Sequence, residues 1–174
     1  MTNPFDSHSA QQHRQEAPQN VRCAVVTVSD TRTPQDDRSG QAIFKGLEEA
    51  GLAVAKRTIV PDEPAELRKI VLELAADEQF DAILITGGTG IASRDQTPET
   101  LSGLFTKELP GYGELLRMLS YQQIGPAAIL SRAVGGLIDT TVVLSMPGST
   151  AAVRLAMDKL ILPEIAHLVS QARS

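Results

Sequence analysis

Apolar residues along the chain follow two alternating periodicities, which predict strands and helices in turn. Val21 to Val28 is an almost continuous apolar run rich in β-branched residues, a pattern typical of a strand buried on both faces of a parallel sheet. After a polar loop, residues 39–50 carry apolar side chains at helical spacing until Gly51 ends the predicted helix. The chain therefore begins, from residue 21, with a strand, a loop and a helix.

The same alternation continues towards the C-terminus. The further predicted strands are Leu52–Val60, Asp81–Thr86 and Thr141–Met146. One further predicted helix begins at Pro64, and two more run from Thr97 to Phe105 and from Gly113 to Ser120. The last predicted helix follows a Ser149 cap and is interrupted at Pro163. Alternating elements of this length predict an α/β fold, a three-layer αβα sandwich with a mostly parallel sheet.

The size and composition of the chain fit one globular domain. With 174 residues, of which 42% are hydrophobic, the chain is long enough to bury a core. Residues 1–20 are polar and lack periodicity, so we expect a disordered N-terminal tail there and one domain over residues 21–174. Cys23, the single cysteine, lies in the first apolar run and is interpreted as a core residue.

Charge and hydropathy argue against several kinds of partner. The net charge of −5 at pH 7 argues against non-specific binding to nucleic acid or to an anionic membrane surface. No apolar stretch reaches the roughly 18 residues of a membrane span, and the N-terminal residues contain no apolar core of a signal peptide. We therefore expect a cytoplasmic protein with no nucleic acid and no membrane as partner.

Four loops that follow predicted strands are rich in glycine, hydroxyl and carboxylate groups. Because open parallel sheets bind their ligands at the carboxyl ends of the strands, these loops form the candidate site. They are Ser29–Arg32, Pro61–Glu63, Gly87–Gly90 and Pro147–Ser149. Three arginines in predicted loops are usually solvated surface charges, but they are also candidates for the positive groups that an anionic substrate needs: Arg38, Arg94 and Arg132.

The glycine loop and two aspartates each allow two interpretations. Gly87–Gly90 is either a tight turn or a loop whose backbone N–H groups bind a phosphate, although it lacks the lysine of a Walker loop. Asp62 either complements the dipole of the helix that begins at Pro64 or ligates the Mg²⁺ of a nucleotide. Asp95 either braces its loop or serves as a second ligand. The residues alone leave these alternatives open.

Seven short motifs stand in order along the chain: Thr27–Arg32, Asp37–Gly40, Val60–Glu63, Thr86–Gly90, Arg94–Glu99, Leu130–Ala133 and Met146–Ser149. Together they resemble the MoaB/MogA family of molybdenum cofactor biosynthesis proteins, over the range from Val21 to His167. The short C-terminus and the stretch from Arg117 to Gly125 place the resemblance nearer to the MoaB branch. A MoaB/MogA-like molybdopterin-binding fold is therefore expected for residues 21–174.

The resemblance implies an enzyme that binds molybdopterin and adenylylates its terminal phosphate with Mg-ATP, releasing pyrophosphate. It implies Mg²⁺, ATP as co-substrate and molybdopterin as substrate. It also implies a homotrimer or a hexamer built as a dimer of trimers, with a downstream molybdenum-insertion protein as a further partner. The alternative is a MoaB-type protein that binds molybdopterin without catalysis.

The family's functional positions map onto residues of this sequence. The residues that match its catalytic and metal-binding carboxylates are Asp62 and Asp95. The residues that match its substrate- and nucleotide-binding positions are Ser29, Asp30, Ser39, Gly87, Gly88, Thr89, Gly90, Ser120, Ser131, Arg132, Ser145, Gly148 and Ser149. Many family members carry Asn where this chain has Ser145. The presence of both aspartates favours the enzyme over the binding protein.

Overall fold

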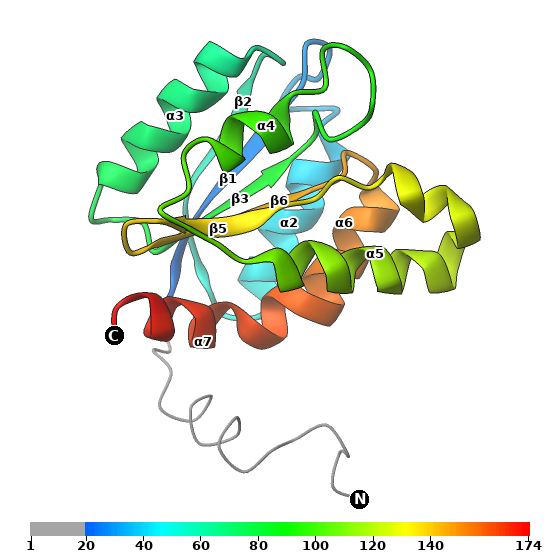
Figure 1. The fold of residues 1–174 in the computed structure, drawn as a ribbon. Coiled ribbons are helices and arrows are strands. Elements are labelled where there is room, and N and C mark those ends of the chain that lie inside the picture. Colours follow the sequence, from blue (N-terminus) through cyan, green and yellow to red (C-terminus); the bar gives the residue numbers. More distant parts are fainter. Residues whose placement is uncertain (1–19) are drawn as a thin grey trace, which may run out of the picture.

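A computed structural model describes residues 20–174, which form a six-stranded sheet with helices on both faces (Figure 1). The predicted tail lies outside the described residues, except for Asn20. The strands are β1 (Arg22–Val28), β2 (Ala53–Val60), β3 (Ala82–Thr86), β4 (Lys107–Glu108), β5 (Gly135–Ile138) and β6 (Thr141–Met146). The helices are α2 (Arg38–Glu49), α3 (Pro64–Ala76), α4 (Thr97–Ser102), α5 (Pro110–Ile124), α6 (Thr150–Ala156) and α7 (Leu162–Ala172), with a 3₁₀-helix η1 (Gly125–Leu130) and a π-helical segment η2 (Met157–Ile161).

The parallel part of the sheet brings four strand ends to one edge. The strand order is β2-β1-β3-β6-β5-β4, and the first four of these strands are parallel. Val28 pairs with Val60, and Thr27 pairs with Thr86, which in turn pairs with Met146. The connections after β1 and β3 lead in opposite directions, towards β2 and β6. The crevice in which such sheets bind ligands therefore lies between the ends of β1 and β3.

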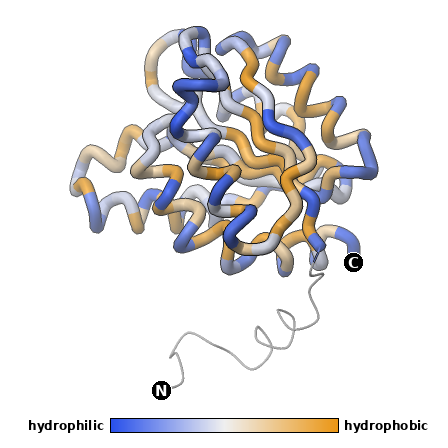
Figure 2. The backbone as a smooth tube through the Cα atoms, turned by 180° about the vertical axis from the view of Figure 1, so that it is seen from behind, coloured by the Kyte–Doolittle hydropathy of each residue, from blue (hydrophilic) through white to orange (hydrophobic). Residues whose placement is uncertain are grey.

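Hydrophobic strand residues pack alternately against two layers of helices. On one face, Cys23 and Val25 pack with residues of α2, α5, α6 and α7. On the other, Ala24 and Val26 pack with residues of α3 and α4. The hydrophobic colouring in Figure 2 accordingly runs along the central strands. Burial on both faces explains why the first apolar run lacks alternation, and the predicted αβα sandwich is confirmed.

The core interpretation of Cys23 is also confirmed. The residue has no exposed surface, and burial raises the pKa of its thiol to about 12. Within residues 20–174, no helix combines the length and the apolarity needed to cross a membrane.

Most predicted element bounds agree with the structure to within a residue, but the third quarter of the chain differs. β6 has the predicted limits, and β1, β2 and β3 each begin one residue later than predicted. Helix α5 is longer than predicted at both ends, because it begins at Pro110 and continues to Ile124. Helix α4 is shorter, with Gln96 rather than Thr97 at its cap position. The short strands β4 and β5 were not predicted. They add an antiparallel edge to the sheet.

The predicted interruption of the last helix at Pro163 is wrong. Helical backbone runs from α6 through η2 into α7 without a break. A proline inside a helix lacks an N–H donor and its ring crowds the carbonyl one turn earlier, and a locally wider turn relieves this crowding. The π-helical segment Met157–Ile161, directly before Pro163, supplies this wider turn.

Candidate functional site

Gly87 and Gly88 turn the chain sharply after β3 and lie at the centre of the candidate site. Their φ angles of +105° and +62° lie in the left-handed region that favours glycine. A β-carbon at Gly87 would collide with the Val28 carbonyl oxygen, and one at Gly88 would collide with Thr97 Oγ1. From the loop after β6, a β-carbon at Gly148 would lie 3.5 Å from Gly87 Cα. Side chains at Gly87 and Gly88 would therefore push the strand-end loops apart, whereas one at Gly148 would make an ordinary contact with Gly87.

The two singled-out aspartates lie against the glycine loop. Asp62 Oδ1 would be 3.0 Å from a β-carbon at Gly88, and Asp95 Oδ2 would be 2.5 Å from one at Gly90. Asp95 Oδ2 also accepts a hydrogen bond from the backbone N–H of Ala92 at 3.0 Å. The loop-bracing interpretation of Asp95 is thus correct, and it leaves Asp95 Oδ1 with no hydrogen bond from the described residues.

Asp62 stands among other carboxylates. Its backbone N–H donates to Asp30 Oδ1 at 3.1 Å, which joins the loops after β1 and β2. Burial raises the pKa of the Asp62 carboxyl group, and the nearby charges of Asp95 and Asp30 raise it further. Within residues 20–174, the Asp62 carboxylate accepts no hydrogen bond, and the charge of Arg94 compensates it only in part. A cation bound beside Asp62 would relieve this repulsion.

Two of the three candidate arginines bind protein groups of the loops. Arg132 Nε donates to the carbonyl oxygens of Gly90 at 2.9 Å and of Thr89 at 3.3 Å, and its guanidinium also contacts the Asp95 carbonyl and the Glu99 carboxylate. Arg94 bridges Asp30 at 3.0 Å and Glu63 at 2.9 Å. Arg132 therefore braces the glycine loop from outside.

The larger of two adjoining cavities has a volume of about 400 Å³ and extends from the glycine loop to α5, η1 and the start of α6. Its predicted lining residues are Gly87, Gly88, Thr89, Gly90, Asp95, Ser120, Ser131, Gly148 and Ser149. Exposed apolar side chains, Ile124 and Leu130 among them, complete the wall. Ser131 Oγ is buried and has no hydrogen-bond partner among the described residues. The cavity thus combines an apolar wall with hydroxyl groups and a glycine turn.

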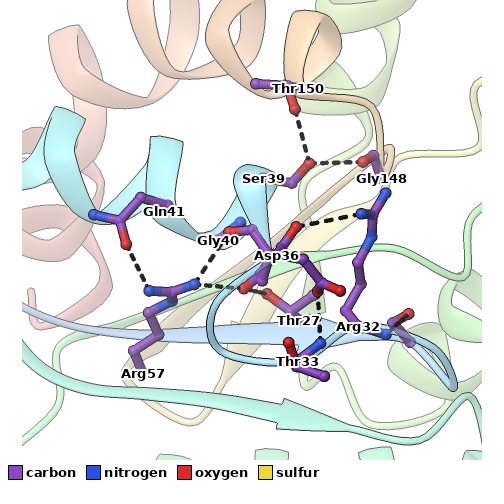
Figure 3. A network of polar contacts seen from close by, with 12 residues as sticks. Thr27, Arg32, Thr33, Asp36, Ser39, Gly40, Gln41, Arg57, Gly148 and Thr150 are labelled. Atoms are coloured by element: carbon purple, nitrogen blue, oxygen red, sulfur yellow. Dashed lines mark hydrogen bonds and ion pairs between the residues drawn. The ribbon is translucent and has the colours of Figure 1, made fainter.

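A second cavity of about 280 Å³ lies on the other side of Gly87 and Gly88, at the crevice between β1 and β3. Ser29, Arg32 and Ser39 line it. Ser39 Oγ donates to the Gly148 carbonyl at 2.7 Å and lies 3.4 Å from Thr150 Oγ1, so α2 and the loop before α6 are tied together (Figure 3). Arg32 supplies a positive group at this cavity.

A buried aspartate network supports the floor of the second cavity. Asp37 caps α2 by accepting from Gly40 N at 2.8 Å, and it accepts from Thr27 Oγ1 at 2.8 Å and from Arg57 Nη2 at 2.9 Å. Burial opposes ionisation of Asp37, but these three donors outweigh it and lower its pKa. Figure 3 shows Arg57 beside Thr27 and Gln41, so that β2, β1 and α2 are held together here.

Not every predicted site residue lines a cavity beside the glycine loop. Ser145 has no exposed surface, and its hydroxyl exchanges two hydrogen bonds of 3.0 Å with the backbone of Val134, so the structure does not bring it to the site. Asp30 and Arg38 line neither of the two cavities beside the glycines. Conversely, the buried hydroxyl of Thr97 and the guanidinium of Arg32 were not singled out. Arg32 could have been found by its strand-end position, whereas nothing in the sequence marks the unpaired state of Thr97.

Comparison with known proteins agrees with this arrangement. Residues 24–167 match a family model described as a probable molybdopterin binding domain. Molybdenum cofactor biosynthesis protein B of Bacillus subtilis is 57% identical over 166 residues, which cover 95% of this chain and 98% of that protein. A crystal structure of a molybdenum cofactor biosynthesis protein B is similar with a TM-score of 0.87 at 51% identity, covering 90% of this chain and 98% of the other.

Two further solved structures come from Thermus thermophilus and Pyrococcus furiosus. The molybdopterin biosynthesis enzyme MoaB of Thermus thermophilus has a TM-score of 0.78 at 36% identity and covers 87% of this chain and 96% of its own. The tungsten cofactor synthesizing protein MoaB of Pyrococcus furiosus has a TM-score of 0.82 at 38% identity and covers 91% of this chain and 100% of its own. The chain therefore belongs to the MoaB family of molybdenum cofactor biosynthesis proteins and carries the probable molybdopterin-binding domain of that family.

Proposed function

We propose that this MoaB-family protein adenylylates molybdopterin. An oxygen of the terminal phosphate of molybdopterin attacks the α-phosphorus of ATP, the bond between the α- and β-phosphates breaks, and pyrophosphate leaves. The attacking phosphate is already ionised at neutral pH, so no general base is needed. The chain's contribution is to align two anionic groups and to neutralise their charge.

The observation that carries the proposal is the convergence of Asp62 and Asp95 on one glycine loop. They come from the loops that follow β2 and β3, and each lies against a glycine of the loop Gly87–Gly90. Mg²⁺ prefers oxygen ligands such as carboxylates, and among residues 20–174 no donor binds the Asp62 carboxylate or Asp95 Oδ1, whereas Asp95 Oδ2 accepts from Ala92 N. Mg²⁺ between the substrate phosphates would neutralise charge on both. No three acidic, His or Cys side chains among residues 20–174 lie close enough to hold a metal ion alone. We expect phosphate oxygens and water to provide the remaining ligands.

The two cavities suggest where each part of the substrates binds. The larger cavity offers an apolar wall for a flat pterin and three hydroxyl-bearing residues, Ser120, Ser131 and Ser149, for its polar edge and phosphate. The buried, unpaired Ser131 Oγ is available for a ligand atom. Ser149 caps α6 by accepting from Ala152 N, so the positive end of that helix also faces the cavity. The glycine turn between the cavities would receive the reacting phosphates.

Pyrophosphate release tests the proposal directly. Purified protein with molybdopterin and Mg-ATP should release pyrophosphate, and Asp62→Asn or Asp95→Asn should lower the rate by about 100-fold or more, because a lost charge at the reacting phosphates is not replaced. Both variants should still bind molybdopterin. Asp158→Asn, an exposed aspartate in η2, is the matched control and should leave the rate unchanged.

Three outcomes would contradict this assignment. Molybdopterin binding without pyrophosphate release, under any nucleotide, would favour the binding protein without catalysis. Turnover in the Asp62→Asn variant equal to that of the wild type would remove Asp62 from the metal-binding role. The same result for Asp95→Asn would leave loop bracing as the function of that residue.

We further propose that the protein works as a homotrimer or as a dimer of trimers, and that its product passes to a molybdenum-insertion protein. The assembly is supported by an exposed apolar face on α5 and η1, which we call the α5 face. It comprises Leu115, Met118, Tyr121, Ile124, Ile129 and Leu130, each at least 46% exposed. Within residues 20–174 only Leu72 and Ile91 are comparable apolar residues elsewhere on the surface. Exposed apolar residues gathered in this way on two consecutive elements are typical of an interaction surface.

A further inference from the structure

The Thr97 side chain at the start of α4 carries a hydroxyl group that no described residue binds. Thr97 is 1% exposed, and its Oγ1 is buried without a hydrogen-bond partner. Leaving a buried hydroxyl unpaired costs about 1–3 kcal/mol, so native structures rarely keep one without a reason. The backbone N–H of the same residue donates to the Gly88 carbonyl at 3.0 Å. Thr97 is therefore held against the glycine loop while its hydroxyl remains free.

The free hydroxyl lies beside a carboxylate that also lacks a donor. Thr97 Oγ1 and Asp62 Oδ1 are both within 3.0 Å of the point that a β-carbon of Gly88 would occupy. Thus they face the same side of one glycine. The Asp62 carboxylate accepts no hydrogen bond from residues 20–174, and its like-charged neighbours cannot donate one. A hydroxyl donor and an unsatisfied acceptor therefore both lie beside Gly88, at the point where the loops after β2 and β3 meet.

We propose that Thr97 is a positioning residue of this site. Its hydroxyl donates a hydrogen bond to the Asp62 carboxylate in the ligand-bound protein and holds that carboxylate against the glycine loop. The inference rests on the proposed function, because it needs Asp62 to face a metal–nucleotide ligand. A hydrogen bond from a neutral hydroxyl orients the Asp62 carboxylate without adding a positive charge that would repel a bound cation.

In this proposal, the Thr97 hydroxyl lacks a hydrogen-bond partner in the ligand-free protein and has one in the ligand-bound protein. Without ligand, the charges of Asp95 and Asp30 repel the Asp62 carboxylate, and Thr97 Oγ1 bears the cost of an unpaired buried group. With a cation present, Asp62 must keep one orientation, and the hydroxyl gains its missing partner. The hydroxyl should therefore contribute to ligand affinity and contribute little or nothing to the stability of the free protein.

Equilibrium binding of Mg²⁺ with α,β-methylene-ATP, an analogue that cannot be cleaved between the α- and β-phosphates, tests this inference by calorimetry. Thr97→Val keeps the shape of the side chain and removes the hydroxyl, and it should bind the analogue about tenfold more weakly, as expected for one lost hydrogen bond to a charged group. Thr97→Ser keeps the hydroxyl and should bind within about twofold of the wild type. In urea, Thr97→Val should unfold at the same or a higher midpoint than the wild type.

Thr141→Val is the matched control, because Thr141 is also buried but its hydroxyl already donates to the Ala75 carbonyl at the opposite end of the sheet. It should bind the analogue as the wild type does. If the wild type binds and Thr97→Val binds equally well, the inference fails and the proposed function stands. If Thr97→Val and Thr97→Ser weaken binding equally, side-chain shape is responsible and the inference fails. If the wild type does not bind the analogue at all, the proposed function fails and the inference fails with it.

Discussion

Gly88 shows how one residue without a side chain determines the shape of the site. Its carbonyl accepts from Thr97 N, and the Thr97 hydroxyl and Asp62 carboxylate lie where its side chain would be. Its φ of +62° is one that other residues adopt only with strain. The pair Gly87 and Gly88 is thus both a tight turn and a ligand-binding candidate. The two interpretations drawn from the sequence describe the same geometry.

Gly88→Ala should therefore damage the site more than the fold. The added methyl group collides with Thr97 Oγ1 and crowds Asp62, so we expect pyrophosphate release to fall by about 100-fold. The free energy of unfolding should fall by about 1–2 kcal/mol or more, from the positive φ and the collision together. Gly51→Ala isolates the backbone effect, because Gly51 has a φ of +74° and nothing within 4 Å of its β-carbon position.

Gly51→Ala should lose about 1 kcal/mol of stability and retain full activity. Urea unfolding and the pyrophosphate assay on both variants measure the two effects separately. A Gly88→Ala protein that is destabilised as much as Gly51→Ala but remains fully active would show that no ligand approaches this turn.

Secondary-structure elements differ in how far the sequence predicts them, and packing explains why. β1, β3 and β6 are largely apolar segments between polar loops, and β2 is a mixed segment that ends in Ile59 and Val60, so their positions follow from local patterns. β5 begins with Gly135 and Gly136, which read as loop residues. A β-carbon at Gly135 would lie 2.8 Å from Leu144, and one at Gly136 would collide with the Phe105 ring. These glycines make room for neighbours that are distant in sequence, and no local pattern contains that information.

The candidate site likewise has features that follow from local sequence patterns and features that depend on contacts distant in sequence. That Asp62, Asp95 and the glycine loop share one edge follows from the parallel strands, and it was predicted. Arg132 bracing the loop and Ser145 bonding to Val134 depend on distances across the fold, so residue type alone could not assign their contacts. The unpaired hydroxyls of Thr97 and Ser131 could be recognised only when every possible partner had a position.

The contact between α7, β1 and the start of β3 leads to a pH-dependent prediction. Asp81 is 2% exposed and forms ion pairs with Arg22 of β1 at 2.9 Å and with Arg173 after α7. Burial opposes ionisation of Asp81, but the hydrogen bonds from Arg22 and the charge of Arg173 outweigh it, so its pKa in the folded protein is lowered. The stabilisation is therefore present above the pKa of the unfolded chain, about 4, and is lost as the pH falls through the lower folded value.

Asp81→Asn should accordingly reduce the free energy of unfolding by about 1–3 kcal/mol at pH 7. The difference in free energy of unfolding between variant and wild type should shrink below about pH 4, where the wild-type carboxylate becomes protonated and is then neutral like the Asn side chain. Urea unfolding at a series of pH values measures this, with Asp158→Asn as an exposed control. A difference that is constant from pH 7 to pH 3 would mean that the charge of Asp81 does not stabilise the fold.

Most of the exposed large apolar residues between residues 20 and 174 lie in the α5 face. The α5 face borders the larger cavity, since Ile124 and Leu130 belong to both. A further hollow of about 360 Å³ lies within it, lined by Tyr121, Pro126 and Ile129 among others. The opposite helical layer, α3 and α4, has only Leu72 as a comparable exposed apolar residue. If copies of the chain associate through this face, assembly and the shape of the cavity wall are connected.

A charge placed in the α5 face tests this arrangement. Met118 is 52% exposed, so Met118→Glu should leave the monomer folded, yet burying an unpaired carboxylate between subunits costs several kcal/mol and should dissociate the assembly. Sedimentation velocity should show a trimer or hexamer for the wild type and a smaller species for the variant. Leu72→Glu, on a residue 42% exposed on the other face, should sediment as the wild type does. A monomeric wild type, or dissociation by Leu72→Glu instead, would place the subunit contact elsewhere or remove it.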